Sequence, residues 1–138
     1  MPLVGGGGAG NTVGGIAGTS KSLVTIGNHI YATSGIVSVD GTETNLINSD
    51  TGNFYCTMKV TFGSGVIVDD SDDITYRIRF NGEIIWQNTQ DHSDAHYAQP
   101  GSLHIIIPPF TTVRFTAENT TDNTSHDQIV IGSGRVYA

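Results

Sequence analysis

Residues 54–62 read FYCTMKVTF, and this stretch decides the fold class. The apolar side chains of Phe54, Cys56, Met58, Val60 and Phe62 alternate without a break with Tyr, Thr and Lys side chains. Because successive side chains of a β-strand point to opposite faces of the sheet, this alternation predicts a strand with one buried and one exposed face. Residues 74–80 and 111–117 repeat the pattern. Such half-buried strands are typical of antiparallel sheets.

Shorter apolar runs between turn-forming residues predict the remaining strands. They span residues 23–26, 30–33, 36–39, 42–47, 83–87, 102–107, 128–131 and 135–137. Eight to ten short strands without a helical period describe a β-sandwich or a small barrel. We expect an all-β fold, a single antiparallel β-sandwich. The lack of a Cys-Trp-Cys framework favours a jelly-roll-like form over an immunoglobulin-like one.

Two hairpin turns can be located. Asp40-Gly41 is predicted to join 36–39 to 42–47, and Asn81-Gly82 to join 74–80 to 83–87. In the second hairpin, a two-residue turn would mix polar and apolar side chains on one face. A three-residue loop with Gly82 in the left-handed region avoids this mixing, so we expect a bulged turn. It pairs Arg79 with Glu83, Ile78 with Ile84 and Tyr76 with Trp86.

The alternation also separates core from surface. Met58 and Val113 are expected to be buried, whereas Lys59 and Arg114 are expected to reach solvent or a neighbouring subunit. Cys56 lies on an apolar face and is expected to be packed and unreactive; as the only cysteine, it forms no internal disulfide. The other expected core residues are Phe54, Phe62, Tyr76, Ile78, Trp86 and Phe115.

Composition limits the classes of partner. Six Lys plus Arg against thirteen Asp plus Glu give a formal net charge of −7, which argues against nucleic-acid binding. The chain has no run of about 18 apolar residues, so we expect no membrane-spanning helix. With 138 residues there is room for one domain, expected at residues 21–138 after an arm at residues 1–20.

The first twenty residues contain eight glycines and no charged side chain. Because glycine loses much backbone entropy on ordering, we expect a flexible arm. Its apolar residues Leu3, Val4, Val13 and Ile16 are candidates for anchoring the arm to a partner; a tail without a role is the alternative. The G-x-G-x-x-G spacing at residues 5–10 does not predict a dinucleotide site, because no strand precedes it and no helical pattern follows.

The richest polar cluster consists of Asp91, His92, Asp94, His96 and Tyr97. A zinc site on its two histidines would need a further ligand, such as His104 or His126. We therefore interpret the cluster as a surface polar loop and expect no metal. A pH-sensitive assembly contact through the histidines stays open.

Other motifs fall short of a functional pattern. Asp69, Asp70, Asp72 and Asp73 form an acidic loop that does not match an EF-hand; we interpret it as solvent-exposed and leave cation binding open. The glycosylation sequon at residues 119–121 is interpreted as turn chemistry. The sequence has no G-x-S-x-G elbow and no P-loop lysine, so we expect no enzymatic activity and no cofactor.

The C-terminal third carries a resemblance. Residues 104–138 read HIIIPPFTTVRFTAENTTDNTSHDQIVIGSGRVYA: an apolar strand, Pro-Pro, an aromatic residue, Thr-Thr, an alternating strand, a polar loop and a last strand ending in GRVY. Together with the stretch from residue 74, this resembles small β-sandwich structural proteins of virus particles. The resemblance is closest to the decoration or cement proteins of bacteriophage capsids, and heads of phage fibres are similar.

The resemblance implies a non-enzymatic virion protein on the capsid surface that binds and stabilises the shell. It implies self-association, with a trimer as the favoured homo-oligomer, and partners among the major capsid protein or other virion subunits. It supplies no catalytic residues. The alternative expectation is a carbohydrate-binding β-sandwich or a fibre-tip adhesin.

Overall fold

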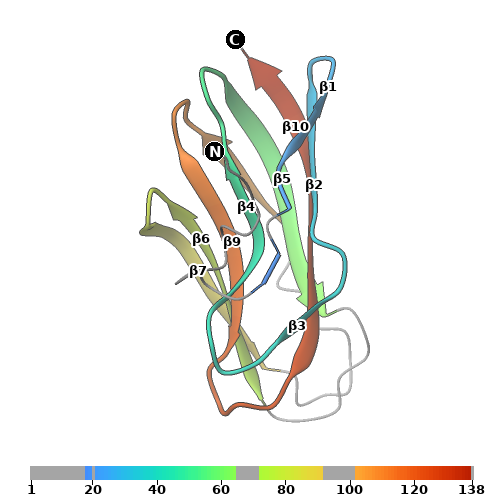
Figure 1. Cartoon of the computed structure of the whole chain (residues 1–138), viewed down its shortest axis with the longest axis vertical. Coiled ribbons are helices and arrows are strands. Elements are labelled where there is room, and N and C mark those ends of the chain that lie inside the picture. Colours follow the sequence, from blue (N-terminus) through green and yellow to red (C-terminus); the bar gives the residue numbers. More distant parts are fainter. Residues whose placement is uncertain (1–17, 20, 65–71, 92–101, 138) are drawn as a thin grey trace, which may run out of the picture.

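The computed structural model describes residues 18–19, 21–64, 72–91 and 102–137. These residues form two antiparallel sheets (Figure 1). No helix in the described part of the chain is long and apolar enough to cross a membrane. The strands are β1 (Val24–Ile26), β2 (His29–Thr33), β3 (Val37–Val39), β4 (Thr44–Asp50), β5 (Tyr55–Ser64), β6 (Asp73–Phe80), β7 (Glu83–Asp91), β8 (Ser102–Ile107), β9 (Thr112–Asn119) and β10 (His126–Tyr137).

The strand order is that of a jelly roll. The six-stranded sheet has the order β1-β2-β10-β5-β8, with β3 also paired to β10, and the four-stranded sheet has the order β4-β9-β6-β7. If the short β1 and β3 are set aside and the other eight strands are renumbered, the orders become 1-8-3-6 and 2-7-4-5. Among these eight strands the chain changes sheet at every connection except the β6–β7 hairpin. The predicted all-β, jelly-roll-like sandwich is confirmed.

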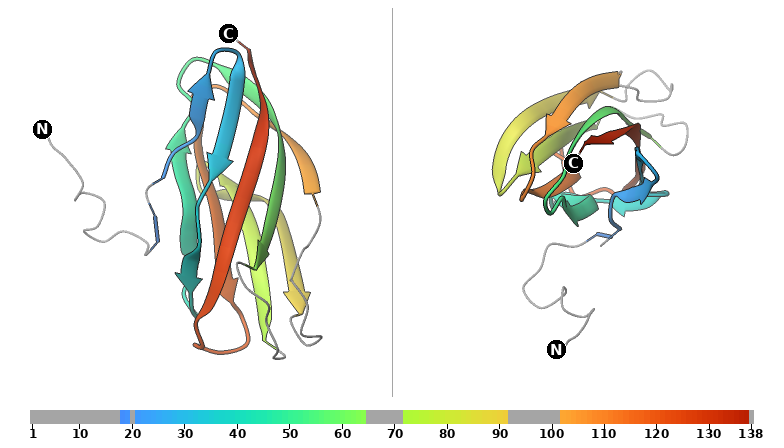
Figure 2. Two further views of the ribbon diagram at one scale, coloured as in Figure 1. Left: turned by 90° about the vertical axis from the view of Figure 1, so that its right-hand side faces the viewer. Right: turned by 90° about the horizontal axis from the view of Figure 1, so that it is seen from above.

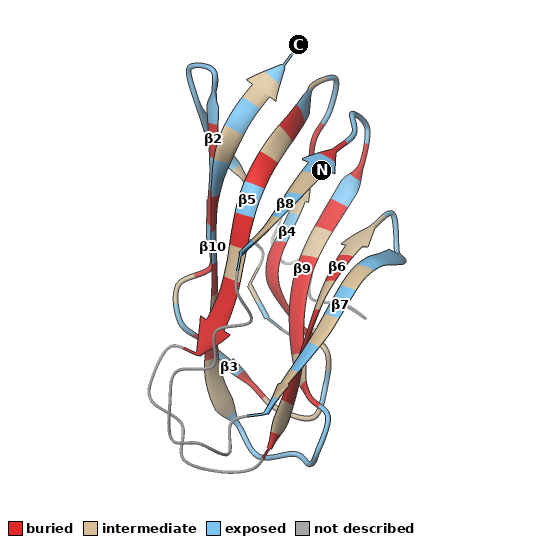
Figure 3. Ribbon diagram, turned by 180° about the vertical axis from the view of Figure 1, so that it is seen from behind, coloured by how far each residue is buried: buried red, intermediate tan, exposed pale blue. Residues whose placement is uncertain are grey.

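The core lies between the two sheets, which pack face to face (Figure 2), and it centres on Phe62 of β5. The Phe62 ring stacks on Trp86 of β7 with 5.5 Å between centroids, and it also contacts Tyr76 and Phe115. Aromatic pairs at such separations stabilise a core beyond the burial of their area. The predicted core residues Met58, Phe62, Tyr76, Ile78, Val113 and Phe115 are buried, and Phe54 and Trp86 are half-buried. Figure 3 shows buried positions alternating with less buried ones along β5.

Cys56 and Lys59 lie where the alternation of β5 places them. Cys56 is fully buried, and burial raises the pKa of its thiol to about 11, so the thiol stays protonated at neutral pH. Lys59 is exposed. Arg114 is different: it is half-buried, its Nε donates to Oδ1 of Asn45 at 2.8 Å, and burial lowers its pKa. Arg114 therefore reaches solvent only in part, because its side chain packs beside Asn45 of β4; contact with a neighbouring subunit stays a prediction.

The predicted Asp40-Gly41 hairpin was wrong. β3 pairs with β10 in one sheet and β4 pairs with β9 in the other, so the chain crosses between sheets at this turn. Oδ1 of Asp40 accepts from the Thr42 amide at 2.9 Å, and the Gly41 amide donates to Asn123. An Asx turn uses the same residue types as a hairpin turn without pairing the flanking strands.

The Asn81-Gly82 turn was predicted in part. Gly82 has a φ of 87°, as expected, but Asn81 is also left-handed at 53°, and Phe80 pairs with Glu83 across a two-residue turn. The bulge lies one step further, where Arg79 pairs with Ile84 and Ile78 pairs with Trp86. The extra residue in β7 returns Trp86 to the core side, where it meets Phe62.

Two further features lie at the ends of the chain. The segments predicted at 128–131 and 135–137 form one strand, β10, which runs through Gly132 and Gly134. At the other end, Thr19 donates its amide to the Asn45 carbonyl and its hydroxyl to the Leu46 carbonyl. Gly18, Thr19 and Lys21 therefore lie along the open edge of β4, and the predicted arm joins the domain at that edge.

Candidate functional site

Most residues of the two predicted sites lie outside the described part of the chain. These are Leu3, Val4, Val13 and Ile16 of the arm and His92, Asp94, His96 and Tyr97 of the polar loop. Asp91 is exposed at the end of β7. The anchoring arm and the surface polar loop therefore stay predictions.

Of the predicted acidic loop, Asp69 and Asp70 lie outside the described residues, whereas Asp72 is buried. Oδ2 of Asp72 is 2.8 Å from Nε2 of His126 and accepts from Asn119 Nδ2 at 3.0 Å. These hydrogen bonds, first the one from His126, lower the pKa of Asp72 despite its burial. The interpretation as a solvent-exposed loop was wrong for Asp72, which ties β6 to the start of β10.

Asn119, the acceptor residue of the sequon, is buried and fully engaged. Its Nδ2 also donates to Asp122 and to the Thr124 carbonyl, while its Oδ1 accepts from two backbone amides of the β9–β10 turn. This confirms the interpretation as turn chemistry. Within residues 18–19, 21–64, 72–91 and 102–137, no three His, Cys, Asp or Glu side chains are grouped so as to hold a metal ion.

The outer face of the four-stranded sheet carries an internal ion-pair network. Glu43 accepts from Nε and Nη2 of Arg79 at 2.8 and 2.9 Å and from Thr116 Oγ1 at 2.7 Å. Arg77 pairs with Glu118 at 2.6 Å. Burial would raise the pKa of Glu43, but the hydrogen bonds from Arg79 and Thr116 and the charges of Arg79 and Arg77 lower it to about 2. The arginines of this network are matched within the chain, so the network stabilises the fold rather than offering free charge.

The outer face of the six-stranded sheet differs. Cross-strand pairs share a face, so the register of β1, β2, β10, β5 and β8 brings sixteen side chains together. One row runs Ile26, His29, Arg135, Thr57 and Ile106, and the next runs Val24, Tyr31, Ser133, Lys59 and His104. The remaining members of this outer face are Thr33, Tyr55, Thr61, Ser102, Ile131 and Tyr137.

The part of the outer face formed by these sixteen side chains is apolar and basic. Seven of the side chains are exposed large hydrophobic or aromatic groups, with Ile26 at 65% and Ile106 at 67% exposure. Its charged side chains are Lys59 and Arg135, with His29 and His104 opposite them. The one carboxylate that the described strands place on this side of the sheet is Asp127, which lies further along β10 and opposite Ser38 of β3. Soluble proteins seldom expose so many neighbouring apolar groups unless the surface binds something. The arrangement suits an apolar partner surface that also carries negative charge.

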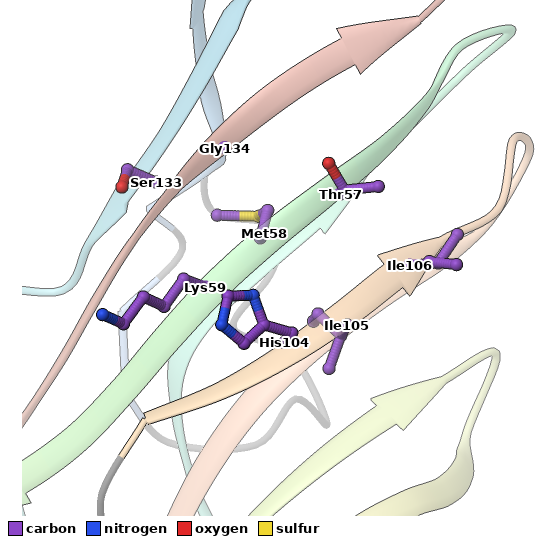
Figure 4. Close-up of a pocket in the computed structure, with 8 residues that line it drawn as sticks. All are labelled: Thr57, Met58, Lys59, His104, Ile105, Ile106, Ser133 and Gly134. Atoms are coloured by element: carbon purple, nitrogen blue, oxygen red, sulfur yellow. The ribbon is translucent and has the colours of Figure 1, made fainter.

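An open pocket of about 500 Å³ lies in this sheet between β10, β5 and β8. Figure 4 shows Lys59 and His104 side by side, with Ile106 further along β8 and Ser133 on β10. The pocket is lined by Thr57, Met58, Lys59, His104, Ile105, Ile106, Ser133 and Gly134. Its lining is mostly apolar, so it can take an apolar side chain beneath basic groups.

Sequence reasoning missed the outer face, although a signal was present. Residues 1–39, 51–68, 95–117 and 128–138 contain no Asp or Glu. The strands β1, β2, β5 and β8 and most of β10 come from these segments. That their side chains form one surface follows only from the pairing of strands that are distant in sequence.

Comparisons with known proteins add no relative. No family model matches the chain, and no curated protein matches it. The function is therefore inferred from the fold and from the outer face.

Proposed function

We propose that this chain is a non-enzymatic structural protein of a virus particle. In this proposal it is a decoration or cement protein of a bacteriophage capsid that binds and stabilises the shell surface, with the major capsid protein or other virion subunits as partners. The supporting observation is the outer face, where seven of the sixteen side chains are exposed apolar groups and the charged ones are Lys59 and Arg135. A surface of this kind favours association over catalysis.

The fold is compatible with this role. Jelly rolls are common among viral capsid proteins, although lectins use them too, so the fold alone does not decide the function. The arm adds a second means of attachment. It joins the domain at the β4 edge, beside Thr19, and its apolar residues are predicted to anchor in a groove of the shell.

Location on the particle tests the proposal. A gold-labelled antibody against the chain, applied to virus particles purified from the producing culture, should label the shell at regular spacing. Shells stripped of the protein should bind the recombinant chain again, and deletion of residues 2–17 should weaken rebinding while leaving the melting temperature nearly unchanged. Label confined to fibres, or absent from particles, would contradict the proposal.

A carbohydrate-binding protein is the second candidate, because of one pair of side chains. Tyr55 and Tyr137 are stacked at 5.0 Å between centroids and are 40% and 38% exposed on the outer face. Exposed aromatic rings are the platform on which sugar rings stack. Selective binding by the isolated chain on a glycan array, lost in Tyr55→Ala and Tyr137→Ala, would favour this candidate.

A further inference from the structure

The charges of the chain are segregated. The sixteen side chains of the outer face include Lys59 and Arg135 and no carboxylate, so they carry a formal charge of +2. Since the whole chain carries −7, the remainder carries −9. Arg135 is directly opposite His29, and Lys59 is directly opposite His104. Lys59 and Arg135 thus have no cross-strand carboxylate within the outer face, so a partner that supplies negative charge would complement them.

The loop that follows β8 presents an unusual aromatic side chain. Phe110 is 75% exposed, and its φ of 55° places a bulky residue in the left-handed region. Two hydrogen bonds of the Thr51 side chain fix the loop. The Thr51 hydroxyl donates to the Pro108 carbonyl at 2.8 Å, and the Thr111 amide donates to Thr51 Oγ1 at 3.0 Å. Thr51 and Thr111 are both buried. An exposed aromatic ring on strained and rigidly held backbone is typical of a site that binds a partner.

Carboxylates lie at the same end of the sandwich as Phe110. The Thr112 hydroxyl donates to Oδ1 of Asp50 at 2.7 Å, and the Asn81 amide donates to the Thr112 carbonyl, which joins Asp50 to the turn that leads into Glu83. Figure 1 shows the β6–β7, β4–β5 and β8–β9 connections at this end. Asp50, Glu83 and Phe110, here named the acidic end, thus combine negative charge with an apolar group.

We propose that the acidic end of one copy of this chain docks on the outer face of a second copy. Phe110 enters the pocket beside Ile106, and Asp50 and Glu83 face Lys59 and Arg135. This inference rests on the proposed function, because it names the molecule that binds the outer face. Pairing of two outer faces is less favourable, because the sixteen side chains of one copy offer no carboxylate to Lys59 and Arg135 of the other. The contact is head-to-tail, so copies form a closed ring or a chain.

Sedimentation velocity of the full-length chain at 50 and 500 mM NaCl tests the proposal. The wild type should form oligomers that weaken at high salt. Phe110→Ala should weaken association at least about 30-fold, as expected of an aromatic anchor. Lys59→Glu/Arg135→Glu should do the same. The controls Ile36→Ala, an exposed apolar residue elsewhere, and Lys21→Glu, an exposed cation elsewhere, should associate like the wild type.

Mixing the variants gives the sharper result. The Phe110→Ala chain keeps its outer face, and the Lys59→Glu/Arg135→Glu chain keeps its acidic end, so the mixture should form a heterodimer through one intact contact. A monomeric wild type, a Phe110→Ala chain that associates normally, or a mixture without heterodimer would each overturn the proposal. A monomer that still decorates shells would overturn this inference alone and leave the proposed function standing.

Discussion

Replacing Glu43 with Gln tests the ion-pair network on the four-stranded sheet. Gln is the nearest uncharged mimic of the protonated carboxyl group, so the variant removes the charge and retains the shape. The pKa of Glu43 falls from 4.5 to about 2 on folding, because the contacts with Arg79, Thr116 and Arg77 outweigh its burial. At about 1.36 kcal/mol for each pKa unit, this corresponds to about 3 kcal/mol of stability at pH 7.

The sign of the pH dependence follows from the lowered pKa. The contribution of Glu43 is fully present above about pH 4.5 and is lost as the pH falls towards 2, where the folded protein binds the proton as well. The difference between wild type and Glu43→Gln should therefore shrink as the pH falls. Asp72, whose pKa is also lowered, contributes equally to both proteins and cancels in the difference.

Urea unfolding at pH 7, 5, 4 and 3, followed by Trp86 fluorescence, measures this difference. The matched control is Glu83→Gln on the same sheet, measured at protein concentrations at which the chain is monomeric; Glu83 is exposed, so this change should alter stability by less than about 0.5 kcal/mol. A loss below about 0.5 kcal/mol for Glu43→Gln at pH 7, or a loss that does not change with pH, would refute the reasoning.

Three further predictions, each comparing two substitutions, test the backbone and the core. Gly82→Ala should cost about 1 kcal/mol because the residue has a φ of 87°, and Gly82→Asn should cost less, as measured by thermal midpoints; equal costs would argue against backbone strain. Gly134→Ala should cost about 3 kcal/mol or more, since its Cβ would lie 1.7 Å from the Thr57 carbonyl oxygen. Gly132→Ala should cost less, because there the flexible end of Met58 is 3.0 Å away, and the reverse order in urea unfolding would contradict the geometry of β10. Met58→Ala should cost about 2–5 kcal/mol, whereas Lys59→Ala in the monomer, away from any interface, should cost less than about 0.5 kcal/mol; comparable urea midpoints for the two variants at dilute protein would contradict the assignment of the faces of β5.

The sequence alone determined the strands and their buried faces. In FYCTMKVTF the alternation is a property of neighbouring residues, so β5, Met58 and Phe62 were predictable without knowing what they pack against. The left-handed Gly82 was predictable for the same reason, because a hairpin turn of this kind requires it locally. Which residue of β7 bulges was not, because that depends on Trp86 reaching Phe62 in the other sheet.

The tertiary structure decided everything that depends on residues far apart in the chain. Asp40-Gly41 has the residues of a hairpin turn, yet the strand before it pairs with β10, about 90 residues away, and the strand after it pairs with β9, about 60 to 70 residues away. Glu43 obtains its low pKa from Arg79 and Thr116, and the apolar and basic outer face exists only because β2, β5, β8 and β10 lie side by side. A sequence pattern records which face of a strand is buried; it does not record which strand lies beside it, and charge, burial and surface complementarity depend on that neighbour.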